Sequence, residues 1–473
     1  MNRPSPSAPR PNQWPVVVAA GLILFMIQLD ALTVATVMPV ITDRLETTPA
    51  TAQWAMLGFT LPAIALVIPV GGWLARIGRR PAVLLSVAGF AAGGVLVAVA
   101  PGIEWLIGAR VLQGAFAAVT FVLMPLVAAE AVAPALRGRA MGLVFAIGPL
   151  GGITGPFLGG LLAEQFGWRA AFLLNLPVAV VVLALASRLP RTLPARAPSR
   201  SFLIETAYLL AAFAPPLLAL TLAVESHPAW LALVLLGAPG LVAWLRTPPG
   251  RQVRRLSGVS AIRGSLIALW SQTAVQASLM MLLPFFLSRE LGAGTAQLGL
   301  PTMAMAAATA ATSSLAGWLT DRWGAARTAA LGMAAITVAV VNLLPFDPQW
   351  SMFELLWRIG LVGVGIGLFA GAQTAMTLTA TPPHLTATAS GAISLFRQTA
   401  LAAAPSLATL GWGLSGYSLE GMRFVLVGAC ALGALGLLAL IARRRAPIDV
   451  ATPAPSQSTS RAGTRNRFQA VRS

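Results

Sequence analysis

The chain has 473 residues, of which 57% are hydrophobic and only 10% charged, with a mean hydropathy of +0.79. A soluble globular domain carries about 25% charged residues, so the composition indicates a polytopic membrane protein. All 32 basic residues are arginine, which excludes a Walker-A nucleotide site and a pyridoxal Schiff base, because both need a lysine. The net charge of +18 fits arginines at helix ends that face anionic lipid, and we expect no nucleic-acid partner.

The single cysteine, Cys430, allows neither an intramolecular disulfide nor a cysteine-based metal site. The two histidines, His227 and His384, each lie beside a proline in predicted loops, so we expect no metal and no other cofactor. The chain offers no Ser/His/Asp set, no histidine cluster and no lysine, so we expect no enzyme. A membrane-embedded enzyme and a non-transporting receptor or scaffold are the alternatives from other classes.

Long apolar runs follow a proline-rich N-terminal tail. About twenty apolar residues cross a bilayer. The pair of runs at 203–245 is the least regular, because prolines interrupt it. On this criterion the sequence predicts fourteen transmembrane helices, near 16–38, 52–74, 82–100, 104–129, 139–162, 170–188, 203–223, 229–245, 264–287, 296–319, 326–345, 353–379, 388–411 and 422–442.

The chain contains an internal repeat. Gly-Gly-Trp-Leu-Ala-Arg ends the second predicted span at 71–76, and Ala-Gly-Trp-Leu-Thr-Asp-Arg ends the tenth at 316–322. A Glu and then an Arg begin both the fourth and the twelfth span. Both matches are offset by eight helices, which indicates two six-helix halves with a helix pair inserted between them. Repeated halves around a midplane site are typical of secondary transporters.

Five regions follow from this repeat and from composition. They are a disordered tail at 1–15, an N-terminal six-helix bundle at 16–190, an inserted two-helix segment with basic linkers at 191–263, a C-terminal six-helix bundle at 264–443 and a basic, disordered tail at 444–473. With the N-terminus inside, inner segments and tails hold 25 Arg, outer loops four and helices three. This bias predicts a multi-pass protein of the cytoplasmic (inner) cell membrane with both termini in the cytoplasm.

One carboxylate, Asp30, lies about halfway along the first apolar run. A charge at that depth costs roughly 2.5–3.5 kcal/mol on insertion scales, so it is rare without a partner or a task. At 1.5 Å per residue, the depth of Arg110 in the fourth span agrees with that of Asp30 to within roughly 3 Å, so the two can face each other. The pair is either a purely structural salt bridge or a proton site. Burial and a neighbouring arginine shift a carboxyl pKa in opposite directions, which allows proton exchange near physiological pH.

The fifth span carries glycines at i, i+4, i+7 and i+11. These lie on one helical face, here called the glycine face: Gly148, Gly152, Gly155 and Gly159. Such a face lets another helix approach closely, and Pro156 is expected to kink the helix because it removes a backbone donor. Generic tight packing is one interpretation. The density of glycines and the Gly-Pro-x-x-Gly-Gly ending favour a specialised packing or hinge face.

Two short inner loops carry charges next to turn glycines. Arg76, Gly78 and Arg79 follow the second span, and Asp321 and Arg322 follow the tenth. These residues either act only as orientation signals or form salt bridges across helix ends that hold one conformation shut.

Polar and soft apolar residues in the spans are candidates for a substrate cavity. A charged residue inside a membrane helix faces the bundle interior or a water-filled cavity, and methionine suits varied apolar contacts. For an apolar residue, ordinary packing or lipid contact is the alternative. The predicted cavity residues are Gln113, Met281, Arg358, Arg397 and Gln398.

Five segments, in order along 16–443, resemble motifs of the major facilitator superfamily in its fourteen-helix drug:proton antiporter branch. They are Leu29-Asp30 to Pro39, Arg110-x-x-Gln113-Gly114, Gly155-Pro156-x-x-Gly159-Gly160, Trp168-Arg169 to Pro177, and Ser390-Gly391 to Arg397-Gln398. Two positions depart from the family pattern. Ala75 replaces the usual Asp of the loop after the second helix, so the gating salt bridge of that loop does not carry over; Ala35 replaces an Asn, which bears on the substrate profile.

The resemblance implies a major facilitator fold that works by alternating access as a proton-coupled exporter, an antiporter, of small amphipathic compounds or drugs, cationic ones among them. In this hypothesis Asp30 carries the proton, Arg110 tunes it, the glycine face supports the interface between the halves, and Arg397 lines the inner cavity. The proton is the coupling ion. The other partners are the small-molecule substrate and a bilayer with anionic inner-leaflet lipids, and the protein is a monomer. The alternative is an exporter or symporter for one specific metabolite.

Overall fold

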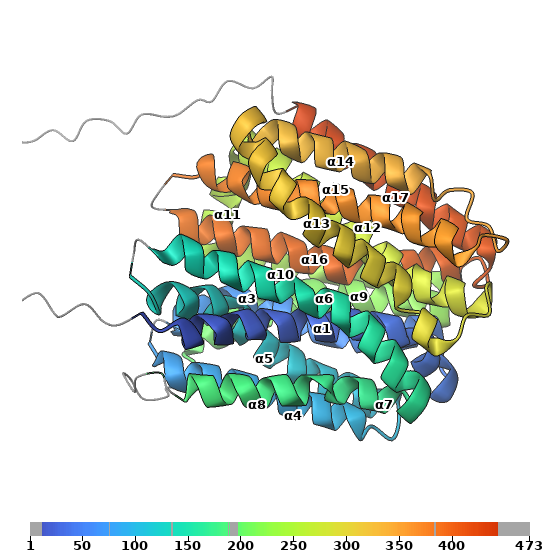
Figure 1. Cartoon of the computed structure of the whole chain (residues 1–473), viewed down its shortest axis with the longest axis horizontal. Helices are drawn as coiled ribbons and strands as arrows, with labels where there is room; N and C mark the ends of the chain where they lie inside the picture. The colour runs from blue at the N-terminus through green and yellow to red at the C-terminus, as the bar shows by residue number, and fades with distance from the viewer. Residues whose placement is uncertain are drawn as a thin grey trace, which may run out of the picture.

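The computed structural model describes residues 12–74, 76–133, 136–187, 189, 197–382 and 385–442. All regular elements in these ranges are helices, and the long ones lie side by side in one bundle (Figure 1). Eleven helices in the described ranges are long and apolar enough to cross a membrane. The fold is therefore all-α, as the sequence predicts. Most of both predicted tails, and Ala75 of the loop motif, lie outside the described residues.

Residues 12–187 form a group of helices, here called the N-terminal half. It contains α1 (Trp14–Arg44), α2 (Pro49–Ala52), α3 (Trp54–Leu74), α4 (Arg79–Ala98), α5 (Ile103–Glu130), α6 (Arg137–Phe166), α7 (Trp168–Ala171), η2 (Phe172–Leu174) and α8 (Asn175–Ala186). α1 packs along α6, and α5 packs against both α3 and α4. These contacts bring α1 and α5, which carry the predicted charge pair, into one group.

Residues 260–442 form the C-terminal half. It contains α12 (Ser260–Arg289), η4 (Thr295–Gln297), α13 (Leu300–Trp323), α14 (Ala325–Val341), α15 (Met352–Thr379), α16 (Thr386–Gly413) and α17 (Leu419–Ala442). α15 packs against α13 and α14, while α12 packs against α16 and α17. The two halves meet through α1 with α12, α3 with α16, and α6 with α13.

The insert lies between the halves in the sequence. It contains α9 (Arg200–Glu225), η3 (Pro228–Leu236), α10 (Gly237–Leu245) and α11 (Pro248–Gly258). α9 packs along α3 and also against α16, so it contacts both halves. The predicted basic linker after the insert is largely α11, an amphipathic helix in which Val253 and Leu256 are buried while Arg254 and Arg255 are exposed.

Several of these helices continue through prolines. The first span is predicted to close at Pro39, but α1 continues through it. α9 is likewise unbroken through Pro215 and Pro216. In membrane helices, neighbouring helices and hydroxyl side chains satisfy the backbone groups that a proline frees. Polar caps are the better boundary signal: Ser351 and Glu354 form a capping box at the start of α15.

Both ends of the described chain lie at the same end of the bundle (Figure 1). We call this end, which includes Trp14 of α1 and Ala442 of α17, the terminal face, and the opposite end the distal face. α1 runs from the terminal to the distal face, and α3 and α5 run back toward the terminal face. These names locate the contacts described below.

Candidate functional site

Three side chains form a buried polar cluster between α1 and α5. Arg110 Nη1 donates a hydrogen bond to Asp30 Oδ2 at 2.7 Å and to Gln113 Oε1 at 2.6 Å. Gln113 Nε2 donates to Asp30 Oδ1 at 3.1 Å. Both carboxylate oxygens therefore accept hydrogen bonds, and the structure brings together the two charges whose depths match in the sequence. We call these three residues the charge cluster.

The charge cluster is closed off by α3. Arg110 Nε donates to the carbonyl oxygen of Ala55 at 2.7 Å, and the guanidinium carbon lies 4.5 Å from the centroid of the Phe59 ring. Such an arrangement adds cation–π attraction to the ion pair. Asp30 is only 2% exposed and Arg110 only 1%, so neither charge is open to water.

Glycines on neighbouring helices make room for the two polar side chains of α5. A Cβ at Gly93 of α4 would lie 2.7 Å from Gln113 Cβ, and one at Gly58 of α3 would lie 3.3 Å from Arg110 Cβ. The absence of a side chain at these glycines lets α3 and α4 approach α5 closely. No motif in the sequence singles out these glycines; the Gly93-Gly94 pair in the third predicted span is the feature that indicates a tight helix contact.

A buried ion pair of this kind reacts strongly to the loss of either charge. Desolvation opposes burial of an isolated charge, so removal of one partner typically costs about 3–5 kcal/mol. The contact between α1 and α5 therefore depends on both charges being present.

The glycine face of α6 holds the helix that carries Asp30. A Cβ at any of its four glycines would meet atoms of α1, including the Leu29 carbonyl oxygen next to Gly155. Thr33 Oγ1 of α1 donates to the Gly155 carbonyl oxygen at 3.0 Å. Only Gly152 also approaches the other half, with Ala306 Cβ of α13 3.8 Å from a Cβ built there. The face thus lies mainly within the N-terminal half, although the sequence predicts a role between the halves.

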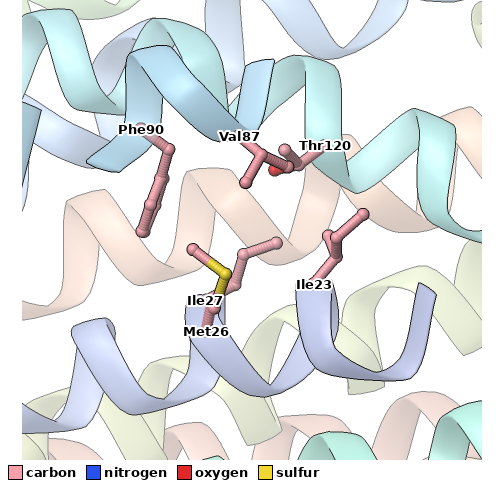
Figure 2. A pocket seen from close by; sticks show the side chains of 6 residues that line it. All are labelled: Ile23, Met26, Ile27, Val87, Phe90 and Thr120. Carbon is pink, nitrogen blue, oxygen red and sulfur yellow. The ribbon is translucent and has the colours of Figure 1, made fainter. Parts of the chain in front are cut away.

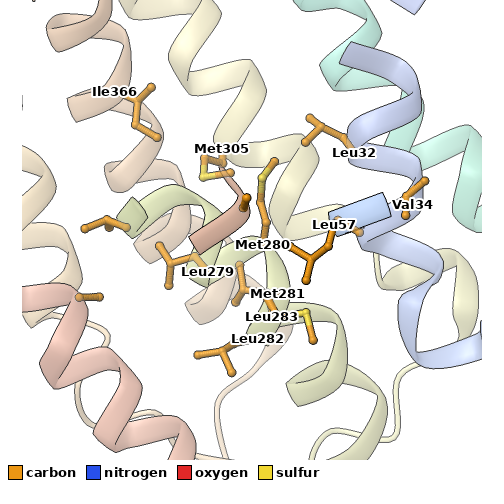
Figure 3. Packing of buried hydrophobic residues seen from close by; sticks show 14 of the residues in the cluster. Leu32, Val34, Leu57, Leu279, Met280, Met281, Leu282, Leu283, Met305 and Ile366 are labelled. Atoms are coloured by element: carbon orange, nitrogen blue, oxygen red, sulfur yellow. The ribbon is translucent and has the colours of Figure 1, made fainter. Parts of the chain in front are cut away.

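An apolar cluster joins the two halves toward the distal face (Figure 3). It includes Leu32 and Leu57 from the N-terminal half and Met280, Met281 and Met305 from the C-terminal half, all buried. Pairing of flexible methionines with leucine gives close packing across an irregular interface. Met281 is therefore part of this apolar seal, and it does not line an accessible cavity in this conformation.

Polar contacts reinforce the seal at the distal face. Within the described residues, two side-chain hydrogen bonds join the halves: Thr409 Oγ1 donates to Gln53 Oε1 at 2.8 Å, and the Ala296 amide donates to Glu164 Oε2 at 3.1 Å. Pro156 also faces the other half, because a Cβ at Gly299, just before α13, would clash with its carbonyl oxygen. The halves are thus closed against each other at this face.

The insert takes part in the same closure. Glu225, at the distal end of α9, accepts hydrogen bonds from Thr51 Oγ1 at 2.9 Å and from Thr48 Oγ1. Tyr417 lies in the loop after α16, and burial together with the negative charge of Glu225 raises its pKa above the usual value. α9 therefore connects the N-terminal half to a loop of the C-terminal half.

Toward the terminal face, the corresponding helix surfaces lie apart. Cβ atoms built at Gly71 and Gly72 of α3, Gly317 of α13 and Gly391 of α16 meet no atom within 4 Å. The first three of these glycines are exposed. The described contacts between the halves therefore gather at the distal face, while these four positions toward the terminal face are unpacked among the described residues.

The charged loop residues at the terminal face do not bridge the halves. Arg79 forms a salt bridge with Glu130 of α5 in its own half, at 2.9 Å, and Gly78 is the N-cap of α4. Arg322 stacks over Trp318 of its own helix, and Arg76 and Asp321 are exposed without an ion pair among the described residues.

The predicted cavity residues do not form one site. Gln113 belongs to the charge cluster and Met281 to the apolar seal. Arg358 lies near the distal end of α15, where Nη1 donates to the Glu354 carbonyl oxygen at 2.9 Å and the guanidinium lies 4.1 Å from the Trp350 ring centroid. Of the neighbouring pair on α16, Gln398 is buried and Arg397 is exposed.

A small cavity of about 10 Å³, room for about one water molecule, lies in the N-terminal half between α1, α4 and α5 (Figure 2). Its lining is apolar apart from Thr120, whose hydroxyl donates to the carbonyl oxygen of Ala117 in its own helix. Drug-sized ligands bind in pockets of about 300–1,000 Å³, so this cavity is too small for one. In the described part of the chain, no three His, Cys, Asp or Glu side chains are placed to hold a metal ion.

Comparison with known proteins agrees with this architecture. The chain matches the family model of the Major Facilitator Superfamily over residues 20–405, and again over 265–472. It is 30% identical over 401 residues to the multidrug resistance protein Stp of Mycobacterium tuberculosis strain H37Rv, covering 82% of this chain and 73% of that protein. It is also 30% identical over 369 residues to the multidrug resistance protein B homolog of the same strain, covering 74% and 67%.

Among solved structures, the chain resembles the crystal structure of the peptide transporter POT, with a TM-score of 0.68. The alignment covers 90% of this chain and 94% of that one, at 15% identity, so it supports the fold alone.

Fold and site together define a multi-pass helical membrane protein with a buried charge pair inside its N-terminal half. The matches place it in a family: the chain belongs to the Major Facilitator Superfamily, and it is a membrane transporter of that superfamily.

Proposed function

We propose that this protein is a proton-coupled exporter, an antiporter, of small amphipathic compounds or drugs. It belongs to the fourteen-helix branch, as two six-helix bundles with an inserted helix pair, and works by alternating access as a monomer. The observation that carries the proposal is the charge cluster, in which the carboxylate of Asp30 is buried and bound to Arg110 and Gln113.

The charge cluster supplies a physical link between a proton and a movement. When Asp30 is ionised, its ion pair with Arg110 holds α1 to α5. When Asp30 is protonated, Arg110 loses its counter-charge in a dry environment, and the arrangement seen here becomes unfavourable by several kcal/mol. Proton binding therefore favours a second conformation, which is the requirement for coupling a proton gradient to transport.

The distribution of arginines sets the orientation of the protein in the membrane. The terminal face is cytoplasmic, because the segments at that face hold most of the arginines and the positive-inside rule sets orientation. The structure then corresponds to the state open to the cytoplasm, in which a compound enters from the inside. Arg254 and Arg255 of α11 lie at the inner leaflet and contact anionic lipid.

The relatives support the substrate class. Stp and the protein B homolog are named multidrug resistance proteins, and a 190-residue segment, 39% of this chain, is 32% identical to the multidrug efflux pump LfrA of Mycolicibacterium smegmatis. A methionine-rich interface between the halves suits contact with varied apolar compounds when the seal opens.

Transport in vesicles tests the proposal. The purified full-length protein is reconstituted in liposomes with an imposed pH gradient, and uptake is measured for ethidium, Nile red and anilinonaphthalene sulfonate. We expect the gradient to drive uptake of at least one of these dyes. Asp30→Asn is expected to lose the gradient-driven component, whereas Asp43→Asn, which changes an exposed carboxylate at the end of the same helix, keeps it. Wild-type, gradient-driven rates in Asp30→Asn liposomes would contradict the proton role.

A further inference from the structure

Arg397 is a charged residue inside a helix. It takes part neither in the charge cluster nor in the contacts at the distal face. It lies 11 residues after the start of α16 at Thr386, roughly 16 Å from the terminal face at 1.5 Å per residue. α16 itself lies near the middle of the molecule, in contact with α12 and with α3 of the other half (Figure 1). Arg397 is thus near the middle of the membrane-spanning region, where the halves meet.

The side chain of Arg397 is exposed. One turn further on, Leu401 packs with Trp270 against an alanine cluster between α12 and α16, and two turns back, on the same face, Ser390 is exposed. A cation at this depth does not face hydrocarbon unless it has a partner. We therefore expect the exposed side chain of Arg397 to face the interior between the helices rather than lipid.

Arg397 has no partner within the described residues: no oxygen accepts a hydrogen bond from it, no carboxylate pairs with it, and no aromatic ring lies under its guanidinium. The other two arginines inside predicted spans are satisfied. Arg110 forms an ion pair with Asp30. Arg358 donates a hydrogen bond to a backbone carbonyl and lies over two tryptophan rings. Five guanidinium donors thus remain available at one accessible point.

A cationic substrate has no comparable accessible side chain to bind among the described residues. The carboxylate of Asp30 is buried, and both of its oxygens already accept hydrogen bonds in the charge cluster. A cation would have to displace Arg110 to reach it. The accessible charge at this depth is positive, and the neighbouring alanine cluster with the partly buried Trp270 and Leu401 is apolar.

We propose that Arg397 is an anion-binding subsite and that the preferred substrates are amphipathic organic acids, with a carboxylate or sulfonate on Arg397 and an apolar body against Trp270 and Leu401. The planar guanidinium donates two parallel hydrogen bonds to such a group, which a lysine does not. This inference rests on the proposed export function and narrows its substrate class from amphipathic compounds in general to acids.

Equilibrium binding to the full-length protein in phosphatidylcholine nanodiscs tests the subsite without a gradient. The probes are naphthoate, naphthylmethanol and naphthylmethylammonium, which share one ring system and differ in charge. We expect naphthoate to bind at least tenfold more tightly than the other two. Arg397→Gln removes that preference by weakening naphthoate alone, and Arg397→Lys keeps part of it. Arg327→Gln, which removes one exposed arginine at the start of α14, leaves the preference intact.

Three results would overturn the subsite: no naphthoate binding, equal affinity for the three probes, or an unchanged preference in Arg397→Gln. A second series with anionic lipid in the nanodiscs separates a solute site from a lipid headgroup site. Loss of naphthoate binding on addition of phosphatidylglycerol assigns Arg397 to lipid and also overturns the proposal. If the subsite fails these tests but a pH gradient still drives dye transport, the proposed export function holds without the subsite. If the protein binds naphthoate but shows no gradient-driven transport, the subsite holds without the proposed export function.

Discussion

Polar and charged residues are paired differently toward the distal and the terminal end of the bundle. At the distal face, Gln53 and Glu164 form hydrogen bonds between the halves, and the nearby mid-depth residue Asp30 is paired and buried. At the terminal face, Arg79 pairs only within its own half, and the mid-depth residue Arg397 is exposed without a partner among the described residues. The same residue types therefore serve closure at one end and access at the other.

This difference shows which interactions a transport cycle has to change. To open the distal face, the apolar seal and two hydrogen bonds between the halves must break, and α9 must release Thr48 and Thr51. The side-chain hydrogen bonds described between the halves lie at the distal face, whereas Cβ atoms built at Gly71, Gly72 and Gly317, toward the terminal face, meet no neighbour among the described residues.

The largest expected effect is at the charge cluster. Arg110→Leu leaves Asp30 buried without its counter-charge, so we expect a loss of about 3–5 kcal/mol in the free energy of unfolding. Arg397→Gln removes an exposed arginine with no protein partner, so we expect a change within about 0.5 kcal/mol. Reversible unfolding in mixed micelles measures both. Equal losses in the two variants would mean that the two ends do not differ as described.

A smaller effect is expected on the tightly packed helix α6. A Cβ at Gly151 would clash with the Phe25 carbonyl oxygen of α1, so Gly151→Ala is expected to cost about 1–3 kcal/mol through overpacking. Gly142 is a matched control on the same helix near the terminal face, where a Cβ meets nothing within 4 Å. We expect Gly142→Ala to be neutral or stabilising by up to about 1 kcal/mol, since alanine favours helix. Thermal unfolding of both variants checks this, and a destabilising Gly142→Ala would contradict the open terminal face.

The hydrogen bond between Thr409 and Gln53, which joins the halves, should control opening of the distal face. Thr409→Val removes the donor to Gln53, which costs about 1 kcal/mol in the closed state and shifts the equilibrium toward the distal-open state about fivefold. The measurement is the rate at which an impermeant maleimide labels Ala296→Cys in a Cys430→Ser background. Thr399→Val is the control, because Thr399 bonds only to the carbonyl oxygen of Phe396 in its own helix. Equal labelling rates in the two threonine variants would argue against the hydrogen bond as a gate.

The smallest effect is expected at the terminal-face salt bridge. The side chains of Arg79 and Glu130 are 27% and 50% exposed, so water and salt screen their attraction. We expect Glu130→Gln to lower the free energy of unfolding by at most about 1 kcal/mol, and by less at high salt. Unfolding at two salt concentrations measures this. A larger loss that is independent of salt would show that this loop contributes more to the fold than its exposure indicates.

Hydropathy and charge placement were sufficient to predict much of this molecule. Apolar runs of membrane-spanning length predict the helices, because the bilayer leaves the backbone few other structures. The depth of Asp30 and Arg110 along two antiparallel spans brought them to matching heights, and the structure places them in contact. The helix ends were less predictable, since Pro39 and Pro215 lie within helices whose neighbours satisfy the freed backbone groups.

Side-chain direction could not be read from depth alone. Met281 and Arg397 are both plausible cavity residues by type, yet one is packed in the seal and the other is exposed. Nor does spacing reveal the neighbour of a helix face: the glycine face of α6 lies mainly against α1 rather than against the other half. Which faces meet depends on the rotation and tilt of whole helices, and these are set by all their contacts together.

The most direct test of the central claim is proton release on substrate binding. The dye transported fastest in liposomes is added to the purified protein in weakly buffered detergent solution at neutral pH, and the pH change is recorded. In the proposed antiport cycle, substrate binding favours the conformation in which Asp30 is ionised, so the wild-type protein releases protons and Asp30→Asn does not, although it still binds the dye. Equal proton release from both proteins would contradict the account, because the proton would then come from a group other than Asp30.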